Sequence, residues 1–358
     1  MDKLKVGIAG YGVVGKRRRV FIDAHPHLST VAVSDVSFGG DGVLPDGVPY
    51  FDNYHKLFQQ ELDILFVSLP NYLAANATIA GLEKGLHVFC EKPPGRDLTD
   101  IANVIACERR HPGLKLKYGF NHRYHDSVRE ALRIVKGQEL GPVINMRGVY
   151  GKSSILSFAS DWRTKRDLAG GGILLDQGIH MVDLMRLFGG EFTQVYSFVS
   201  NNYWHHDVED NAYALMRNKD GVVAMLHSSA TQWRHRFQLE ITFWHGMIVL
   251  SGILSGTKSY GAETIMVAYA NKDDGGDPLE ITTRYNKDNS WRDEIGEFAE
   301  AILNGNSISA GSSQDAMNTM RLVYSIYCAD PVWHAQYNLN NNVPAGYIYE
   351  EDKKDIKG

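Results

Sequence analysis

The chain has 358 residues, of which 44% are hydrophobic and 22% are charged, so it is long enough for two domains that each bury a core. A formal net charge of -5 gives no electrostatic basis for nucleic-acid binding, and no apolar run reaches the roughly eighteen residues of a membrane helix. The N-terminus enters a predicted strand without a signal-peptide core, and three widely spaced cysteines match neither a metal site nor a redox motif. We therefore expect a reduced, cytoplasmic protein without a bound metal, a nucleic-acid partner or a membrane partner.

The first predicted elements enclose a glycine-rich turn. Lys5 to Ala9 is a short apolar run typical of a strand, and a helix-like run extends from Val14 to about Ala24. Between them the sequence fits G-x-G-x-x-G, whose glycines serve a tight turn, the approach of a pyrophosphate and close helix–strand packing. Phosphates would also meet free N–H groups at the start of the helix. The expected phosphate-binding residues are Gly10, Gly12, Val13, Val14 and Gly15.

A second predicted strand, Thr30 to Ser34, ends in Asp35, about twenty residues past the last of these glycines. A carboxylate at this position binds the ribose of a dinucleotide and repels a 2′-phosphate. The pattern therefore predicts NAD as the cofactor, with NADP as the alternative. A glycine turn in some other strand–helix–strand unit is the competing interpretation.

Strands and helices continue to alternate through the first third of the chain. Predicted strands cover 62–68, 86–90 and 115–120, and predicted helices cover 72–84 and 99–110. This alternation is typical of a doubly wound parallel sheet, in which ligands bind at the carboxyl ends of the strands. The residues expected at these ends, and so along one crevice, are Gly10, Asp35, Pro70, Glu91 and Asn121.

The pattern changes after residue 121. A helix at 125–136 and a strand at 143–150 lead to a glycine-led helix that ends near residue 188. The β-rich segments that follow predict a mostly antiparallel sheet, at 192–201, 211–216, 222–231, 233–244 and 247–250. Helical spacing returns at 293–303 and 313–328. We expect a dinucleotide-binding domain at 1–121, a substrate and oligomerisation domain at 122–340, and a polar extension at 341–358, with helices within 291–328 able to pack on either domain.

Lys92 lies at a predicted strand end and precedes two prolines. Pro93 restricts it to extended conformations, and this proline could also be cis. A positioned ammonium can polarise a carbonyl or lower the pKa of a hydroxyl. The alternative is a solvated surface lysine before a turn.

Asp176 and His180 are four residues apart on the glycine-led helix, so their side chains share one face. Apolar neighbours would bury most of that helix, and polar groups there need a partner or a cavity. A histidine titrates near neutrality and can carry the proton that accompanies hydride transfer. The alternative is a core histidine with an aspartate at the helix start.

Four motifs together resemble the Gfo/Idh/MocA family of NAD(P)-dependent oxidoreductases. They are G-I-A-G-Y-G-V-V-G, E-K-P at 91–93, G-F-N-H-R-Y at 119–124 and G-G-G-I-L-L-D-Q-G-I-H at 170–180, and their order and spacing match over about 330 residues. The resemblance implies an N-terminal Rossmann domain, doubly wound, followed by an α/β domain with a large, open, mostly antiparallel sheet. It also implies dimers or tetramers that pair through the outer face of that sheet.

The resemblance assigns roles to individual residues. Lys92 matches the catalytic lysine that hydrogen-bonds the reacting oxygen, His180 the proton carrier, and Asp176 the group that orients substrate or base. Arg123, in the third motif, is expected to contact substrate with these three. The further residues expected along the cofactor are Ser68, Leu69, Pro70, Asn71, Glu91, Lys92, Asn121, Trp162 and Arg163. Many members carry histidine where this chain has Ala74, a departure that we take as local to the loop.

The substrate class follows from the resemblance only coarsely, as sugars, cyclitols or nucleotide sugars. Arg234 and Arg236 share one polar face of the segment 233–244, where they could face solvent, a subunit contact or an anionic group of the substrate. The adjacent histidines of 204–207 point apart in a strand, which argues against a metal site. Two rival functions stay open: an NAD-dependent glycosidase of the same family, and an NAD(P)-binding regulator without catalysis.

Overall fold

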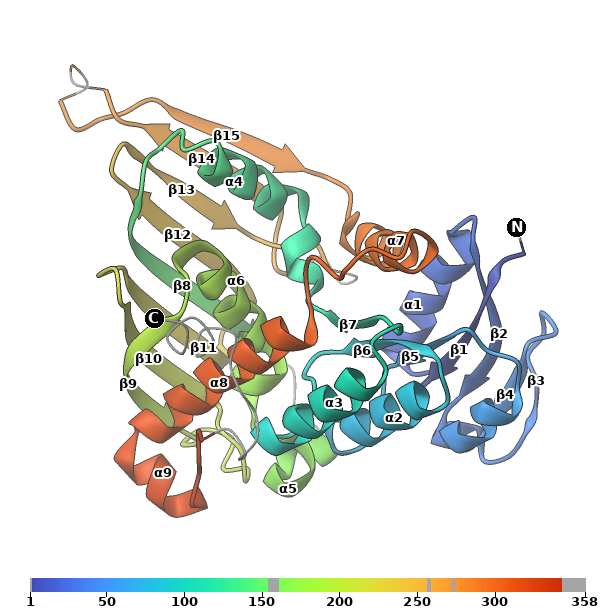
Figure 1. The fold of residues 1–358 in the computed structure, drawn as a ribbon. Helices are drawn as coiled ribbons and strands as arrows, with labels where there is room; N and C mark the ends of the chain where they lie inside the picture. Colours follow the sequence, from blue (N-terminus) through green and yellow to red (C-terminus); the bar gives the residue numbers. More distant parts are fainter. Residues whose placement is uncertain (1, 154–160, 256–258, 272, 274, 343–358) are drawn as a thin grey trace, which may run out of the picture.

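The computed structural model describes residues 2–153, 161–255, 259–271, 273 and 275–342, which fold around two sheets (Figure 1). The first sheet has seven strands in the order β3-β4-β2-β1-β5-β6-β7, and the second has eight in the order β15-β14-β13-β12-β8-β11-β10-β9. Among the described strand pairs, those of the first sheet are parallel except β3–β4, and those of the second are antiparallel except β8–β11. The predicted fold class is confirmed.

The first sheet is buried between helices, as its strand composition predicts. The strand β5 reads I-L-F-V and is buried along its whole length, because helices cover both faces of a parallel sheet. The elements of this unit are β1 (Leu4–Ala9), α1 (Val13–Ala24), β2 (Leu28–Ser34), β3 (Gly42–Val43), β4 (Pro49–Phe51), β5 (Ile64–Val67), α2 (Asn71–Glu83), β6 (His87–Glu91), α3 (Leu98–Arg110) and β7 (Leu116–Gly119).

The second sheet carries helices on one face, and Figure 1 shows α4 and α6 lying across it. Its strands alternate buried and exposed side chains, as a sheet with one covered face requires. The elements are α4 (Asp126–Lys136), β8 (Val143–Ser153), α5 (Arg166–Ala169), α6 (Ile179–Gly189), β9 (Phe192–Ser200), β10 (Asn211–Asn218), β11 (Val223–Gln232), β12 (Arg236–Phe243), β13 (Gly246–Ser251), β14 (Glu263–Tyr269) and β15 (Glu280–Tyr285).

Three further helices, α7 (Ser290–Leu303), α8 (Ser313–Ala329) and α9 (Pro331–Tyr337), follow the second sheet. The helix α7 returns to the first unit, where Phe298 joins a buried cluster with Ile8 and Phe66. The helix α8 packs against both α3 and α6. We therefore propose a division near residue 121, with α7 belonging structurally to the first unit and α8 joining the two. None of the helices in the described ranges is both long and apolar enough to cross a membrane.

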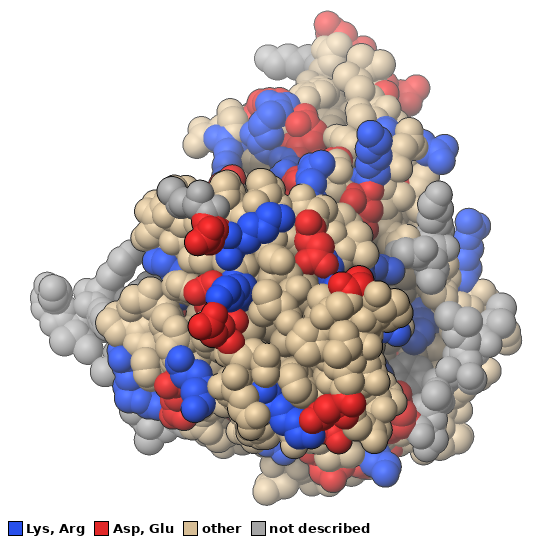
Figure 2. Space-filling model, turned by 90° about the vertical axis from the view of Figure 1, so that its right-hand side faces the viewer, with Lys and Arg blue, Asp and Glu red and all other residues tan. Residues whose placement is uncertain are grey.

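The surface of the first unit carries charges of both signs. Figure 2 shows basic and acidic side chains intermingled on the side of the molecule that faces right in Figure 1. Several of them pair, as Lys56 does with Asp41 and Asp52, both at 2.8 Å. The polar extension expected within 341–358 lies outside the described residues from residue 343 onwards.

Candidate active site

The glycine turn has the geometry that a dinucleotide requires. Gly10 has φ of +90°, and a Cβ there would lie 2.3 Å from the carbonyl oxygen of Ser68. A Cβ on Gly15 would lie 2.0 Å from the Gly10 carbonyl oxygen, so only glycine allows this contact between helix and turn. Gly12 caps α1 without a side-chain hydrogen bond, and a Cβ there meets nothing within 4 Å. The N-terminus of α1 is therefore open to a phosphate group.

Asp35 lies beside this turn at the end of β2. Its carboxylate accepts hydrogen bonds from the backbone N–H groups of Tyr11, at 2.8 Å, and Ser37, at 2.9 Å, which fix its position. Val13 follows Gly12, Val36 follows Asp35, and their apolar side chains are 80% and 81% exposed. Exposed apolar side chains beside the glycine turn and Asp35 fit a ligand that covers them. The residues present thus fit a dinucleotide.

The loop after β5 connects the two units. Asn71 is buried, and its Nδ2 donates a hydrogen bond to the carbonyl oxygen of Ala169 in the second unit, at 2.7 Å. Trp162 approaches the first turn of α2 from the second unit, with its ring centroid 6.4 Å from that of Tyr72. The Arg163 guanidinium lies over the Trp162 ring at 4.4 Å. The structure therefore places Trp162 beside Tyr72, the residue that follows the expected cofactor residues 68–71, while the contacts of Trp162 and Arg163 with a cofactor stay a prediction.

Glu91 belongs to a buried ionic cluster beneath the site. Its carboxylate accepts a hydrogen bond from Arg18 Nε at 2.5 Å, and Arg18 Nη2 lies 2.7 Å from Glu294 Oε2 on α7. The Arg18 guanidinium stacks between the rings of Phe89 and Trp291, at 4.4 and 4.2 Å. Arg18 is fully buried although it belongs to a run of four basic residues, 16–19. A contact between Glu91 and the cofactor stays a prediction.

Lys92 follows β6 and reaches across to the second unit. The Lys92–Pro93 peptide bond is cis, as the sequence allowed. Lys92 Nζ donates a hydrogen bond to the backbone carbonyl of Asp176 at 2.5 Å and lies 4.0 Å from Asp176 Oδ1. The two side chains are 20% and 35% exposed, so both face a partly open space. The interpretation of Lys92 as a solvated surface lysine is wrong.

Asp176 and His180 lie where a π-helical turn at 174–178 joins α6. Such turns occur frequently at functional sites. His180 is only 5% exposed, and its Nδ1 is buried with no hydrogen-bond partner in the described part of the chain. Burial, reinforced by the neighbouring His122 and Lys92, holds the pKa of His180 well below its usual value. The imidazole is therefore neutral at neutral pH and can accept a proton.

The structure adds residues that the sequence prediction missed. The ring of His122 stacks on His180 with centroids 3.7 Å apart and an interplanar angle of 10°. The Tyr150 hydroxyl lies 3.1 Å from His122 Nε2, and Gln177 Nε2 donates to the Tyr260 hydroxyl. His122 falls inside the third motif, so its position there could have indicated it. Tyr260 precedes a strand that was not predicted, and no sequence signal indicated it.

Arg123 has a different environment from the one expected. Its Nε and Nη2 donate to the two carboxylate oxygens of Asp183 on α6, both at 2.7 Å, and its Nη1 donates to Asp315 on α8 at 3.1 Å. The guanidinium is thus held between two carboxylates within the protein. The geometry supports a structural role and gives no support to the expected substrate contact.

Two other expectations concern the edges of the site. Asn121 donates from Nδ2 to the Ser290 hydroxyl at 3.1 Å and is buried, so its cofactor contact stays a prediction. Arg236 is exposed on the outer face of the second sheet and donates to Gln238 Oε1 at 2.9 Å. This arginine therefore faces away from the site. No cluster of metal-binding side chains occurs among the described residues.

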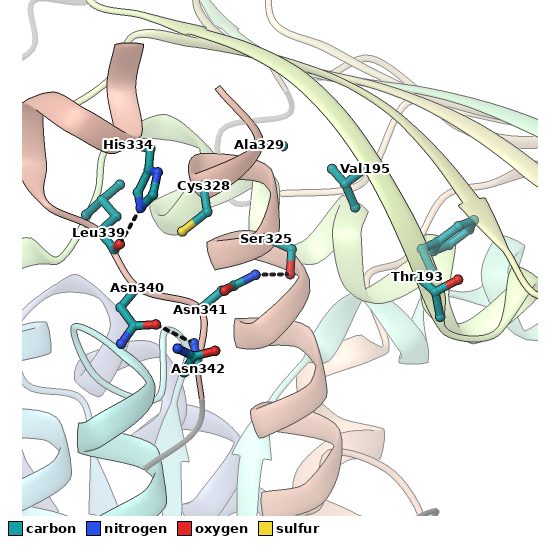
Figure 3. Close-up of a pocket in the computed structure, with 11 residues that line it drawn as sticks. Thr193, Val195, Ser325, Cys328, Ala329, His334, Leu339, Asn340, Asn341 and Asn342 are labelled. Carbon is teal, nitrogen blue, oxygen red and sulfur yellow. Dashed lines mark hydrogen bonds between the residues drawn. The ribbon is translucent and has the colours of Figure 1, made fainter. Parts of the chain in front are cut away.

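The cavity in Figure 3 lies elsewhere, between β9, α8 and the segment that follows α9. It measures about 480 Å³ and is lined by Cys328, His334 and polar amides such as Asn341. His334 Nε2 is already bonded to the carbonyl oxygen of Leu339 at 2.8 Å. None of the residues that converge near Lys92 lines this cavity, so it does not compete as the catalytic site.

Comparison with known proteins identifies the class of protein that this fold and site define. A model of an oxidoreductase family with an NAD-binding Rossmann fold matches residues 4–120, and the GFO/IDH/MocA C-terminal domain matches residues 128–249. The chain therefore belongs to the Gfo/Idh/MocA family and is an NAD(P)-dependent oxidoreductase, as its four motifs indicated.

Individual relatives are dehydrogenases of small sugars and polyols. D-xylose 1-dehydrogenase (NADP(+)) 2 of Haloferax volcanii is 26% identical over 329 residues, which cover 90% of this chain and 95% of that protein. Levoglucosan dehydrogenase of Pseudarthrobacter phenanthrenivorans is 26% identical over 222 residues, which cover 56% of this chain and 55% of that protein. A structure of levoglucosan dehydrogenase in complex with NADH shares the fold, with a TM-score of 0.79 at 20% identity over 93% of this chain and 98% of that one.

Proposed function

We propose that this protein interconverts a secondary alcohol and a ketone on an uncharged sugar or cyclitol. The observation that supports this most is the convergence of Lys92 from the first unit with Asp176 and His180 from the second. An ammonium, a carboxylate and a neutral imidazole are the groups that such a reaction needs. Bound NAD(P) supplies the acceptor for the hydride in oxidation and its donor in reduction.

In the oxidation direction, His180 takes the proton of the substrate hydroxyl, because burial keeps its imidazole neutral. Lys92 donates a hydrogen bond to the same oxygen and stabilises the negative charge that develops there. Asp176 accepts a hydrogen bond from a neighbouring substrate hydroxyl and holds the sugar in place. In the reduction direction, protonated His180 returns the proton to the oxygen. These roles of Lys92, Asp176 and His180 are part of the proposal.

An uncharged substrate fits the charges around the site. Within the described ranges, Lys92 is a cation with an exposed face near Asp176, whereas Arg123 is neutralised by Asp183 and Asp315. The neighbouring groups, Gln177 and Tyr260, are neutral hydrogen-bonding side chains. Such a set suits hydroxyl groups better than a phosphate or a diphosphate, which would require more than one free cation.

A spectrophotometric screen tests the proposed function. The purified protein is incubated with NAD or NADP and D-xylose, levoglucosan, myo-inositol, glucose 6-phosphate or a nucleotide sugar. We expect reduced nicotinamide to accumulate with an uncharged sugar or cyclitol, and faster with NAD than with NADP because of Asp35. Preference for the phosphorylated or nucleotide sugars would contradict the substrate class. Release of an aglycone without net reduction would favour the glycosidase.

We also propose that the protein assembles through the outer face of its second sheet. Tyr196 and Phe198 on β9 are 73% and 80% exposed, and Tyr213, Leu215 and Met225 on the neighbouring strands are 47%, 48% and 52% exposed. Their strands are adjacent in register, so these side chains form one apolar patch. Light scattering should give a multiple of 40 kDa for the native chain and a smaller mass for Phe198→Lys. A native mass of one chain would contradict this assembly.

A reducing, cytoplasmic location is the last part of the proposal. Cys90, Cys107 and Cys328 are free thiols in the described structure. Burial raises the pKa of Cys90 to about 12, which keeps this thiol unreactive. Fractionation of the native host should recover the protein with cytoplasmic markers, and recovery with secreted proteins would contradict the proposal.

A further inference from the structure

His122 and His180 form a stacked pair in the site, and the structure determines which ring nitrogen of His122 carries a hydrogen. Ser290 Oγ donates a hydrogen bond to a carboxylate oxygen of Asp288 at 2.6 Å, since a carboxylate can only accept. Ser290 Oγ must therefore accept the hydrogen bond from Asn121 Nδ2, at 3.1 Å. This contact orients the amide of Asn121, so that its carbonyl oxygen faces His122 Nδ1 at 3.2 Å. His122 therefore carries its hydrogen on Nδ1.

The other ring nitrogen of His122 has a complementary partner. With a hydrogen on Nδ1, a neutral His122 presents a lone pair on Nε2, and the Tyr150 hydroxyl lies 3.1 Å away as the donor. Tyr150 is itself held by ring contacts with Phe237 and Tyr260, whose centroids are 5.2 and 5.4 Å from its own. Burial lowers the pKa of His122 well below its usual value, which agrees with a neutral ring. A one-way chain of hydrogen bonds therefore donates from Tyr150 through His122, Asn121 and Ser290 to Asp288, and it fixes both the tautomer and the plane of His122.

This fixed ring covers one face of His180. The two rings are nearly parallel, with centroids 3.7 Å apart, and both residues are less than 10% exposed. Phe120 contacts His180 edge-on at 6.4 Å. The chain does not extend to His180: both ring nitrogens of His122 bond to Asn121 and Tyr150, and His180 Nδ1 has no partner in the described structure. His122 therefore acts on His180 through packing and exclusion of water.

We propose that His122 is a positioning residue for the reaction proposed above. Its fixed, neutral ring keeps the imidazole of His180 parallel to itself and shields it from water. His180 thereby stays able to accept a proton. The inference rests on the proposed function, in which His180 carries the proton. The other charged groups that act on His180 are Lys92 after β6, His125 beside His122 and, further away, Arg18 on α1. Two more titratable groups lie around the pair: Tyr150 on β8 bonds to His122, and Asp176 on the π-helical turn lies beside Lys92.

Histidine-labelled ¹⁵N NMR tests the tautomer in the native protein, independently of turnover. The His122 and His180 signals are identified by their loss in His122→Phe and His180→Gln. We expect His122 to show a protonated Nδ1 and an unprotonated Nε2 bonded to a donor from pH 5.5 to pH 8. A charged His122, or one with its hydrogen on Nε2, would overturn the inference.

The titration of His180 then tests the shielding. In His122→Ala, water reaches the exposed face, so the His180 midpoint should rise by about one pH unit or more. In His122→Phe an aromatic ring still covers that face, so the midpoint should stay close to the native one. His55→Ala is the matched control, because His55 stacks on Tyr54 at 4.1 Å in the first unit. An unchanged midpoint in His122→Ala would overturn the proposed role.

Kinetics distinguish a failure of this inference from a failure of the proposed function. With an uncharged sugar as substrate, the acid limb of kcat/KM should move with the His180 midpoint in His122→Ala and stay in place in His122→Phe. If the NMR midpoints move as expected while the acid limb does not follow them, His122 positions His180 but His180 is not the proton carrier. If neither moves, the positioning role itself is refuted.

Discussion

At the scale of single residues, burial changes what His180 can do. An exposed histidine titrates near pH 6.5, and on that basis the sequence predicted a proton carrier that titrates near neutrality. The structure buries the ring against His122, which lowers its pKa. A lowered pKa means that the neutral, proton-accepting form persists as the pH falls through 6.5. Oxidation should therefore stay fast at slightly acidic pH and decline only further below it.

Lys92 gives a sharper test at the same scale. Lys92→Met keeps the length of the side chain but removes the ammonium that lies 4.0 Å from Asp176 Oδ1. We expect kcat/KM to fall by about 10²- to 10³-fold, since one stabilising donor to the developing charge is lost. The affinity for NADH, followed by fluorescence titration, should change little. Lys219→Met, at an exposed turn between β10 and β11, is the control.

An unchanged turnover in Lys92→Met would remove this residue from the mechanism. A loss of NADH binding equal to the loss of turnover would instead assign Lys92 to the cofactor. These two outcomes are distinct, because binding and turnover are measured separately.

At the scale of the elements, the network around Arg123 holds α6 and α8 together. Arg123→Met would leave the carboxylate of Asp183, whose side chain is 1% exposed, without its bidentate partner. Removing one member of a buried ion pair costs about 3–5 kcal/mol, so the free energy of unfolding in urea should fall by that amount. Arg133→Met, which breaks pairs on the exposed surface of α4, should change stability little.

Kinetics of the same variant decide between a structural role and the substrate role that the family resemblance implied. If Arg123 is structural, the KM for a sugar should stay near the native value under conditions where the variant is folded. A large rise in KM without a loss of stability would restore the substrate contact.

The sequence predicted elements best where the alternation of apolar and polar residues continues over many positions. The strand β12 was predicted with its buried face, and Phe237, Leu239 and Ile241 are all buried. The strands β3 and β4 have only two and three residues, too few for a period to show. The strand β14 alternates clearly and could have been predicted. The helix α9 also carried a signal that was not used, since Asp330 caps it and Pro331 is its first residue.

The site was predictable in its outline, because its glycines, Asp35, Lys92, Asp176 and His180 occur in motifs. The partners of these residues were not, because they depend on which faces meet in three dimensions. His122 and Tyr150 come together only when the segment before α4 crosses β8. Arg123 was assigned to substrate by its motif alone, whereas Asp183 and Asp315 lie 60 and 192 residues further along the chain.

At the scale of the whole molecule, a buried ionic cluster joins α7 to the first sheet. Burial raises the pKa of Glu294 to about 7, against the opposing charge of Arg18. A raised pKa in the fold means that the stabilising contribution of this group is complete below about pH 4.5 and is lost as the pH rises through 7. The change corresponds to roughly 3 kcal/mol at most.

Glu294→Gln should remove this dependence. We expect the difference in unfolding free energy between the native chain and the variant to shift in favour of the variant from pH 4.5 to pH 8, as measured by urea denaturation. Glu300→Gln, at an exposed position on the same helix, is the control. A constant difference for Glu294→Gln would show that this carboxyl does not titrate in that range.

The two units act together because several buried contacts join them. Asn71 bonds to Ala169, and the Tyr324 hydroxyl donates to the Arg96 carbonyl at 2.7 Å. These contacts fix Lys92 of one unit relative to His180 of the other. The proposed chemistry depends on this fixed relation, since both groups must reach one substrate oxygen.

A crystal structure of the ternary complex with NADH and a poorly reactive polyol measures this relation directly. The account predicts one hydroxyl oxygen within about 3 Å of both Lys92 Nζ and His180 Nε2, with its carbon facing C4 of the nicotinamide. A polyol bound with that oxygen on only one of the two groups, or on neither, would contradict the account.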